Sequence, residues 1–375
     1  MLVRWRTLMS RSLAGVMLSL LFVALAVEAE AGYLGTLLLS DLPTWPGRVV
    51  RLAQGPVTGG TWAYPTWGDI NSDGHPDLVL GSAYGDVLAY PSDERGGLGP
   101  PLPLLVSDLP AVGVSLMPAV PCLTDLTLDG LPDLLLLLGD RLVLYESRAS
   151  GLASGQELRN CDGRPLGQAM ADVLAAGGPC GLTALRTPAV FLLSTTAGEL
   201  WELEIVDRRV FVLNGPVRLG GASGRFSEAV RVALADPDAD GQQELVAGGS
   251  SRVYVCETVD GGWGQPTLLG EGLRTPDGIE TGVVAPAALG PGRLLLGTAW
   301  GPVAVADVRG EKLTVTEWLT ASDVPLDVGL CAAPVACDWN GDRRQDLVVA
   351  GADGLLRVLM AGIDGGYDSA ATVQD

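Results

Sequence analysis

Short apolar segments alternate with turns rich in aspartate and glycine along most of this chain. The clearest segments are DLVLGSA at 77–83, DLLLLLG at 133–139, ELVAGGS at 244–250 and DLVVAGA at 346–352. Each is a near-continuous apolar run of strand length, which indicates a β-strand buried on both faces. Continuous helical periodicity is nearly absent, so the pattern predicts an all-β fold.

An acidic nonapeptide runs into each of these four strands. The copies are DINSDGHPD from Asp69, DLTLDGLPD from Asp125, DPDADGQQE from Asp236 and DWNGDRRQD from Asp338. Their first aspartates are 56, 111 and 102 residues apart, and the two long gaps halve to about 55 and 51 residues. Repeats of this length that are built from strands are typical of propeller blades.

The two long gaps contain what two further units would leave behind. Residues 189–206 and 293–308 each carry two apolar strands without an acidic loop. The repeat therefore predicts a single β-propeller of six four-stranded blades. Within a blade we expect strand A before the loop, strand B after it, a short glycine turn, and then strands C and D.

The two ends of the chain indicate how the ring closes. Only about 15 residues follow the third strand of the last unit, and they contain no convincing fourth strand. LLLSDLP at 37–43 echoes LLVSDLP at 104–110, which ends the first unit. We therefore expect an N-terminal strand to complete the last blade and remove an exposed edge. Residues 48–60 are then an inserted hairpin or loop, or alternatively part of a seventh blade.

The first 31 residues have the organisation of a secretory signal peptide. Arg4, Arg6 and Arg11 precede an apolar run at 12–27, and the AEA triplet at 29–31 places small residues where a signal peptidase reads. The apolar run is shorter than the roughly 20 residues of a membrane span. We predict cleavage and export to the extracellular space, the cell surface or the periplasm. An uncleaved N-terminal anchor is the alternative.

The remaining residues, 32–375, are predicted to form the propeller, and their composition limits its partners. The formal net charge of the whole chain is −20, which argues against nucleic acid or an anionic membrane as partner. No later segment looks membrane-spanning, and we expect a monomer. Cys161 and Cys180 are the pair best placed for a local disulfide, and buried free thiols are the alternative.

Oxygen-bearing residues recur at fixed positions of the four acidic loops. Side-chain oxygens occupy positions 1, 3, 5 and 9, and a backbone carbonyl at position 7 adds a ligand. Carboxylates and carbonyls without histidine or cysteine ligands favour Ca²⁺ over transition metals. The expected side-chain ligands are Asp69, Asn71, Asp73, Asp77, Asp125, Thr127, Asp129, Asp133, Asp236, Asp238, Asp240, Glu244, Asp338, Asn340, Asp342 and Asp346, and the expected carbonyl ligands are those of His75, Leu131, Gln242 and Arg344.

The four loops are not equivalent as calcium sites. The loop that begins at Asp69 has the most favourable ligand set. In the other loops Thr127 is a weak neutral ligand, and Glu244 is longer than the aspartate it replaces. Arg343 stands where the other loops have a turn glycine, which is expected to cost about 1 kcal/mol in backbone strain.

A helix-flanked EF-hand loop is the obvious rival, because its first six positions look alike. An EF-hand needs a bidentate glutamate at position 12. The four loops have Leu80, Leu136, Ala247 and Val349 at that position. Each loop also runs into a strand pattern rather than a helix. Both the missing glutamate and the following strand therefore argue against an EF-hand.

These loops and the strands after them resemble the FG-GAP or VCBS repeats of integrin-α-like β-propellers, in which a DxDxDGxxD loop joins the first two strands of a blade. Four units match clearly and two lack the ligands, so the resemblance covers nearly all of 32–375. It implies calcium at the loop positions, on one face of the disc. It does not imply one activity, since such proteins include adhesion proteins, polysaccharide-acting proteins and uncharacterised exported chains.

The face opposite the loops is the expected ligand surface. Its B–C turns carry Tyr84 and Trp300, and its D–A connections carry Arg225, Phe226 and Arg274. Aromatic and arginine side chains are frequent binding anchors, although many exposed loop aromatics bind nothing.

Tryptophans near the loops are expected to serve packing instead. Trp62, Tyr64 and Trp67 cluster before the first loop, and Trp339 is the second residue of the last loop. Packing between blades is favoured over carbohydrate stacking for these side chains.

Support for enzymatic chemistry is thin. The single histidine, His75, lies in the first loop, where its carbonyl is the useful group, so His-dependent triads are disfavoured. No GxSxG, HExxH or phosphate-binding glycine loop occurs. We predict an exported calcium-binding propeller that acts as a binding or adhesion module for protein or polysaccharide. A polysaccharide lyase or hydrolase on the same scaffold is the alternative.

Overall fold

The computed structural model describes most of the chain after residue 50. The described residues are 51–52, 55–56, 64–82, 87–93, 97–100, 102–103, 119–148, 151–171, 178–185, 189–223, 225–259, 262–282, 284–321, 324–326, 328, 330–351, 356–363 and 366–368. They belong to the unit Gly47–Asp375, whereas the unit Met1–Pro46, with the predicted signal peptide and the strand at 37–43, lies outside them. Among the described helices, none has the length and apolar character needed to cross a membrane.

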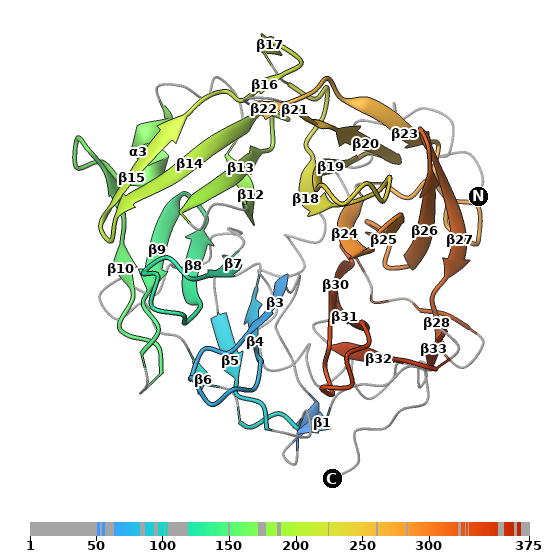
Figure 1. The fold of residues 1–375 in the computed structure, drawn as a ribbon, viewed down its shortest axis with the longest axis horizontal. Helices are drawn as coiled ribbons and strands as arrows, with labels where there is room; N and C mark the ends of the chain where they lie inside the picture. The colour runs from blue at the N-terminus through green and yellow to red at the C-terminus, as the bar shows by residue number, and fades with distance from the viewer. Residues whose placement is uncertain are drawn as a thin grey trace, which may run out of the picture. The chain divides into compact units, whose positions relative to one another are not determined.

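The polypeptide forms a β-propeller, as the repeat predicts, with antiparallel blades arranged in a ring (Figure 1). Six sheets follow the expected A–B–C–D order and are numbered here as blades 1 to 6. Their strands are β3 (Tyr64–Gly68), β4 (Asp77–Gly81), β5 (Val87–Tyr90) and β6 (Leu102–Pro103) in blade 1; β7 (Ala119–Thr124), β8 (Asp133–Leu138), β9 (Arg141–Tyr145) and β10 (Gln156–Glu157) in blade 2; β12 (Pro179–Ala184), β13 (Val190–Thr195), β14 (Leu200–Asp207), β15 (Val210–Asn214) and an added β11 (Arg159–Asn160) in blade 3; β18 (Arg231–Ala235), β19 (Glu244–Gly249), β20 (Arg252–Cys256) and β23 (Thr267–Glu271) in blade 4; β24 (Ala285–Gly290), β25 (Arg293–Gly297), β26 (Val303–Arg309) and β27 (Lys312–Trp318) in blade 5; and β30 (Ala333–Cys337), β31 (Asp346–Ala350), β32 (Arg357–Ala361) and β33 (Tyr367–Asp368) in blade 6.

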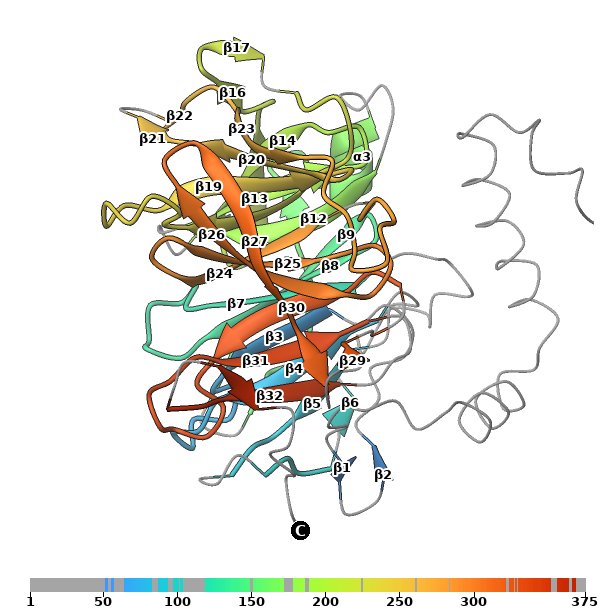
Figure 2. The same cartoon turned by 90° about the vertical axis from the view of Figure 1, so that its right-hand side faces the viewer.

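The first strand of each blade lines the centre of the ring. These inner strands contact one another in the order β3, β7, β12, β18, β24 and β30, and β30 returns to β3. The two segments without acidic loops, 189–206 and 293–308, form β13 with β14 and β25 with β26, as predicted. The edge-on view shows the strands of neighbouring blades lying one above another (Figure 2).

A seventh sheet of four strands is also present among the described residues. It consists of the two-residue strands β16 (Arg218–Leu219), β17 (Ala222–Ser223), β21 (Thr258–Val259) and β22 (Gly262–Trp263), at the periphery between blades 3 and 4 (Figure 1). The described residues thus contain the six predicted blades and a seventh sheet. The seventh sheet does not come from residues 48–60, which were the alternative source of a seventh blade. That segment contributes the hairpin β1 (Arg51–Leu52) and β2 (Gly55–Pro56), which confirms an inserted hairpin.

Two further elements lie outside the blades. A two-stranded sheet joins β28 (Thr320–Ala321) and β29 (Val324–Pro325). A six-residue helix, α3 (Leu166–Ala171), precedes blade 3 and buries Leu166 and Met170.

The last blade departs from the sequence prediction. Its fourth strand is β33, which pairs antiparallel with the Met360–Ala361 end of β32. The expectation that the last residues hold no fourth strand was therefore wrong. The segment 37–43, which was expected to supply that strand, lies outside the described residues. β33 is only two residues long and has no apolar run, so the strand pattern gave no signal for it.

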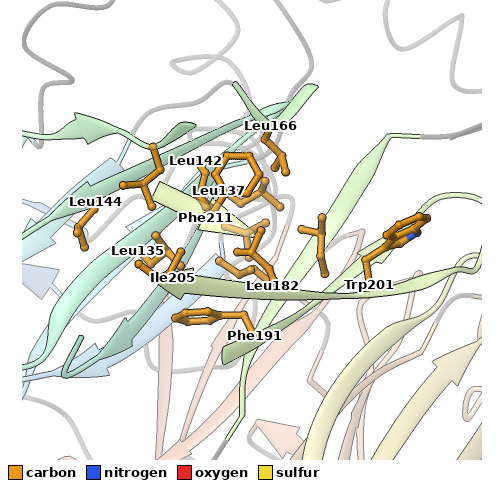
Figure 3. Close-up of a cluster of buried hydrophobic side chains, with 14 of the residues drawn as sticks. Leu135, Leu137, Leu142, Leu144, Leu166, Leu182, Phe191, Trp201, Ile205 and Phe211 are labelled. Carbon is orange, nitrogen blue, oxygen red and sulfur yellow. The ribbon is translucent and has the colours of Figure 1, made fainter. Parts of the chain in front are cut away.

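Apolar side chains fill every junction between neighbouring blades. In blade 2, Leu134 and Leu136 point into the cluster shared with blade 1, whereas Leu135 and Leu137 point into the cluster shared with blade 3. Phe191 of blade 3 joins the second cluster, which Figure 3 shows in close-up. Because successive strand residues face opposite sides, a B strand that packs on both neighbours must be apolar at every position.

A glycine near the end of strand B recurs because the next blade comes very close there. A Cβ on Gly81 would lie 2.1 Å from the carbonyl oxygen of Ala119, and one on Gly297 would lie 2.2 Å from that of Ala332. Backbone hydrogen bonds link the same places, for example from the Ala119 amide to the Ser82 carbonyl. The glycines in LGS and LGT thus permit backbone contact between blades.

Blades 6 and 1 meet through two tryptophans. Trp67 on β3 stacks on Trp339 with ring centroids 4.4 Å apart and an interplanar angle of 28°. Both pack into a cluster with Leu78 and Tyr90 of blade 1 and Val348 of blade 6. The prediction that these two tryptophans pack between blades is confirmed, and the pair joins the first blade to the last.

We expect Trp339→Ala to lower the free energy of unfolding by about 3–5 kcal/mol, because it removes a large buried side chain and its stacking partner at the ring junction. Urea denaturation measures the loss. Trp300→Ala is the control, since Trp300 is 43% exposed and its loss is expected to cost less than about 1 kcal/mol. Equal losses in the two variants would show that the stacked pair does not secure the junction.

Candidate functional site

The four acidic loops join strands A and B of blades 1, 2, 4 and 6, and they share one backbone conformation. Position 4 has a positive φ in every copy, at Ser72 (63°), Leu128 (57°), Ala239 (63°) and Gly341 (75°). Position 6 is also left-handed, at Gly74 (88°), Gly130 (90°), Gly241 (89°) and Arg343 (68°). The fourth loop keeps the turn although it lacks glycine at position 6, which fits the strain expected for Arg343.

The carboxylate at position 1 holds this turn in place. Asp69 accepts hydrogen bonds from the backbone amides of Asp73 (3.2 Å) and Gly74 (2.9 Å). Asp125 and Asp236 make the equivalent pairs of bonds. Asp338 accepts only from the Arg343 amide, and its Oδ1 is buried without a hydrogen-bond partner among the described residues.

The carboxylate at position 5 orients the residue whose carbonyl was predicted as a ligand. The position-7 amides of His75, Leu131, Gln242 and Arg344 each donate to the position-5 aspartate, at 2.7–3.0 Å. At position 3, Asn71 and Asn340 accept from the amides of Asp73 and Asp342. Asp238 accepts in the same way from Asp240, at 3.2 Å.

The aspartate at position 9 is fully buried and connects the loop to strand C. Asp133 accepts from the amides of Leu126 and Thr127 with one oxygen and from the amide of Ser147 with the other. Asp77 and Asp346 are bound in the same manner, to Ile70 with Ser92 and to Trp339 with Ala361. Burial raises the pKa of all three carboxyls, and the backbone amides only partly offset it.

Glu244 breaks this pattern in the third loop. Its side chain is 2% exposed, and Oε2 has no hydrogen-bond partner among the described residues. Burial, followed by the charges of Asp238, Glu257, Asp240 and Asp236, raises the pKa of Glu244 to about 7.

The third loop is also where acidic oxygens converge. One oxygen each from Asp236, Asp238 and Glu244 lies within 4.8 Å of the others, and no other such group of three His, Cys, Asp or Glu residues was found among the described residues. An unpartnered buried oxygen beside two further carboxylates suits a hard cation. Sequence reasoning ranked the Asp69 loop first, whereas the carboxylates come closest in the Asp236 loop.

In the fourth loop an arginine side chain already pairs with one of the acidic residues. The guanidinium of Arg344 pairs with Asp342. The Arg344 amide, the Asn340 side chain and the Arg344 charge hold the pKa of the Asp342 carboxyl below its usual value. Because Arg344 occupies one of the predicted ligands, this loop is the least suited of the four to a metal.

The predicted ligand residues on the opposite face differ in their surroundings. Phe226 is buried at 4% exposure and packs on Tyr254, with centroids 5.4 Å apart, so its assignment to a ligand surface was wrong. Arg225 is exposed and donates to the carbonyl of Ala197 (3.0 Å). Tyr84 lies outside the described residues.

Arg274 and Trp300 lie close together because both contact Glu280. The indole Nε1 of Trp300 donates to the Glu280 carbonyl (2.7 Å), and the guanidinium of Arg274 is 3.7 Å from the Glu280 carboxylate. Arg274 also donates to the carbonyl of Gly278 (2.7 Å). Ile279 is 51% exposed and belongs to the same loop. We call Arg274, Ile279, Glu280 and Trp300 the Trp300 surface.

The centre of the ring holds residues that sequence reasoning did not select. Arg231 begins the inner strand β18, and its guanidinium donates to the hydroxyl of Tyr64 on β3 (2.8 Å). A lone charged residue between Val230 and Val232 in an inner strand was the available signal. The six cysteines are free, so the expected Cys161–Cys180 bridge is not formed, and Cys161 is exposed.

Comparison with known proteins supports the fold only. No protein-family profile matches the sequence, and none of the curated proteins is detectably similar to it. A lectin from Agrocybe aegerita that recognises non-reducing terminal N-acetylglucosamine has a similar fold, with 14% identity over 82% of this chain and 81% of the lectin and a TM-score of 0.50. A triple arginine-to-alanine mutant of AofleA from Arthrobotrys oligospora matches with 10% identity over 87% and 94% of the two chains and a TM-score of 0.52.

We expect Asp133→Asn to destabilise the protein in EDTA by about 1–3 kcal/mol. The amide keeps only one acceptor oxygen for amides that approach from two sides, so at least one buried N–H loses its partner. Asp129→Asn, at an exposed position of the same loop, is the control and is expected to change stability by less than about 0.5 kcal/mol. Urea denaturation compares them, and equal effects would contradict the role assigned to Asp133.

Proposed function

We propose that this protein is an exported, calcium-stabilised β-propeller of the FG-GAP or VCBS type that acts as a binding module for a polysaccharide. The observation that carries the proposal is that the two ends of the blade strands carry different groups of residues. Acidic loops occupy the A–B end of the blades, and the Trp300 surface occupies the B–C and D–A end. Export rests on the pattern of residues 1–31, which is typical of a signal peptide.

Calcium would be held chiefly by the third loop. Asp236, Asp238 and Glu244 bring three carboxylates together, and Asp240 with the Gln242 carbonyl completes the oxygen-rich set. Bound calcium supplies positive charge that offsets the mutual repulsion of these groups and ties strand A to strand B. The loops of Asp69 and Asp125 have the same backbone and are the next candidates.

A carbohydrate ligand is favoured by the composition of the Trp300 surface. An exposed indole held by its Nε1 presents a flat apolar face, and the adjacent, exposed Arg274 has further N–H donors beyond those that contact Gly278 and Glu280. The lectin from Agrocybe aegerita shows that a propeller with a similar fold can recognise a terminal sugar. A protein ligand is the competing outcome, because tryptophan and arginine are also frequent anchors of protein interfaces.

Calcium is expected to raise the melting temperature of the wild-type protein. Extracellular modules bind calcium with dissociation constants of about 10⁻⁴ to 10⁻³ M, so 10 mM calcium would add about 1.4–2.7 kcal/mol through one site. Glu244→Gln is expected to differ from wild type both in EDTA and in calcium. In EDTA it melts higher than wild type because a buried negative charge is gone, and in calcium it gains less.

The control for this experiment is Glu204→Gln, in blade 3, which has no acidic loop. It is expected to keep the full calcium response. Differential scanning calorimetry in EDTA and in calcium measures all three proteins. A wild-type melting temperature that calcium leaves unchanged would refute the calcium proposal, and an equal calcium response in Glu244→Gln would refute the assignment to the third loop.

Glycan-array binding is expected to depend on Trp300 and Arg274. Trp300→Ala removes the stacking face and should weaken binding at least tenfold, the equivalent of about 1.4 kcal/mol, and Arg274→Ala should weaken it in the same direction. Leu268→Ala, at a residue of similar exposure (40%) on the outer strand β23, should bind normally. Binding that survives both substitutions would place the ligand elsewhere, and release of unsaturated sugars would favour a lyase.

A further inference from the structure

A cavity of about 200 Å³ lies where the inner strands begin, at the end of the ring away from the acidic loops. Its wall includes Tyr64 of blade 1, Cys180 of blade 3, Arg231 of blade 4, Thr298 of blade 5 and Cys331, which precedes β30 of blade 6. Five blades therefore converge on one small space. It borders Thr196, which is exposed, so the cavity is open to solvent.

Arg231 supplies a positive charge in this cavity. Its guanidinium carbon lies 4.9 Å from the centroid of the Tyr64 ring, and one nitrogen donates to the Tyr64 hydroxyl. Blades 1 and 4 are opposite each other in the order of inner strands, so this contact crosses the axis of the ring. Both interactions are with Tyr64, whose side chain contains no carboxylate.

Among the described residues, no carboxylate forms an ion pair with Arg231. Burial raises the pKa of the Cys180 and Cys331 thiols, which Arg231 only partly offsets, so both thiols are neutral at pH 7. A guanidinium has five N–H donors in a planar fork, and the Tyr64 hydroxyl takes one of them.

A second group in the wall also lacks a partner. Thr298 is 1% exposed, and its hydroxyl oxygen makes no hydrogen bond to any described residue. A buried hydroxyl without a partner is unfavourable, and such groups in native proteins usually meet water or a ligand. Thr298 follows strand β25 of blade 5, whereas Arg231 begins β18 of blade 4. Two donors from adjacent blades therefore border the same space.

We propose that this axial cavity binds a small oxyanion, a carboxylate or sulfate group, through the guanidinium of Arg231 and the hydroxyl of Thr298. A planar carboxylate and a tetrahedral sulfate each present two oxygens that match the fork of an arginine, which forms two parallel hydrogen bonds with them. The cavity is smaller than the roughly 300–1,000 Å³ of sites for drug-sized ligands, so it fits one charged group or one acidic sugar rather than an oligosaccharide. None of the residues of the Trp300 surface lines the cavity, and the acidic loops lie at the other end of the inner strands.

Isothermal titration calorimetry of the full purified chain tests the proposal. The titrants are sodium sulfate, sodium glucuronate and glucose, and sodium chloride keeps the ionic strength constant. Saturable binding of sulfate or glucuronate, but not of glucose, is expected. Tighter binding of glucuronate than of sulfate would assign the site to an acidic sugar, and the reverse order would assign it to a free inorganic anion. Absence of any saturable anion binding above chloride overturns the proposal.

Two substitutions locate the binding. Arg231→Gln is expected to weaken anion binding by about tenfold to a hundredfold, the range for a hydrogen bond to a charged group. Thr298→Val preserves the shape of the side chain and is expected to weaken it several-fold without loss of stability. Arg218→Gln, at an exposed arginine on the peripheral strand β16, should bind as wild type does. Binding that both Arg231→Gln and Thr298→Val leave unchanged refutes the assigned site.

Thiol alkylation gives a readout on the wild-type chain, which covers the case in which Arg231→Gln does not fold. The neutral reagent iodoacetamide modifies thiols, and mass spectrometry reads each cysteine separately. Saturating sulfate or glucuronate is expected to slow modification of Cys180 and Cys331 and to leave the exposed Cys161 unchanged. If the anion leaves the modification rate of each of the three cysteines unchanged, the axial cavity is not occupied by it.

Discussion

A buried carboxylate at the start of strand B is the interaction on which the repeated blade depends. In blades 1, 2 and 6 it binds one or two backbone amides of its own loop with one oxygen and an amide at or just beyond the end of strand C with the other, as Asp77 does with Ile70 and Ser92. These bonds fix the loop relative to three strands at once. They also explain why an acidic residue tolerates complete burial, since each oxygen has a donor.

Strand B owes its apolar character to its position between two neighbouring blades. Its successive residues alternate between those two neighbours, as Leu134 and Leu135 do. Every position then faces an apolar surface, and the strand cannot show the alternating pattern of a half-exposed sheet. The glycine at its end follows from the next blade, whose backbone approaches too closely for a side chain, as Ala119 approaches Gly81.

Local features of the fold were predictable because their causes are local. The spacing of the acidic loops located the B strands, and the two apolar segments without loops were recognised as blade strands. Features that depend on distant residues were not predictable. Phe226 looks like an exposed loop aromatic until Tyr254 packs on it. β33 exists through its pairing with β32, and nothing in its own two residues encodes a strand. Arg231 becomes notable only when four other blades surround it.

The inner strand β18 has the positive charge of Arg231 at its start and the acidic third loop after its end. Arg231 begins β18 and Asp236 directly follows its last residue, Ala235, so five residue steps along a strand separate the two by about 17 Å. At that distance a unit charge contributes only about 1 kcal/mol even at an effective dielectric constant of 20, and about 0.2 kcal/mol in water. Direct electrostatic coupling between a cation in the loops and an anion at the axis is therefore weak. Any larger influence of one end on the other must pass through β18 itself, because its first residue borders the axial cavity and its last residue leads into the third loop.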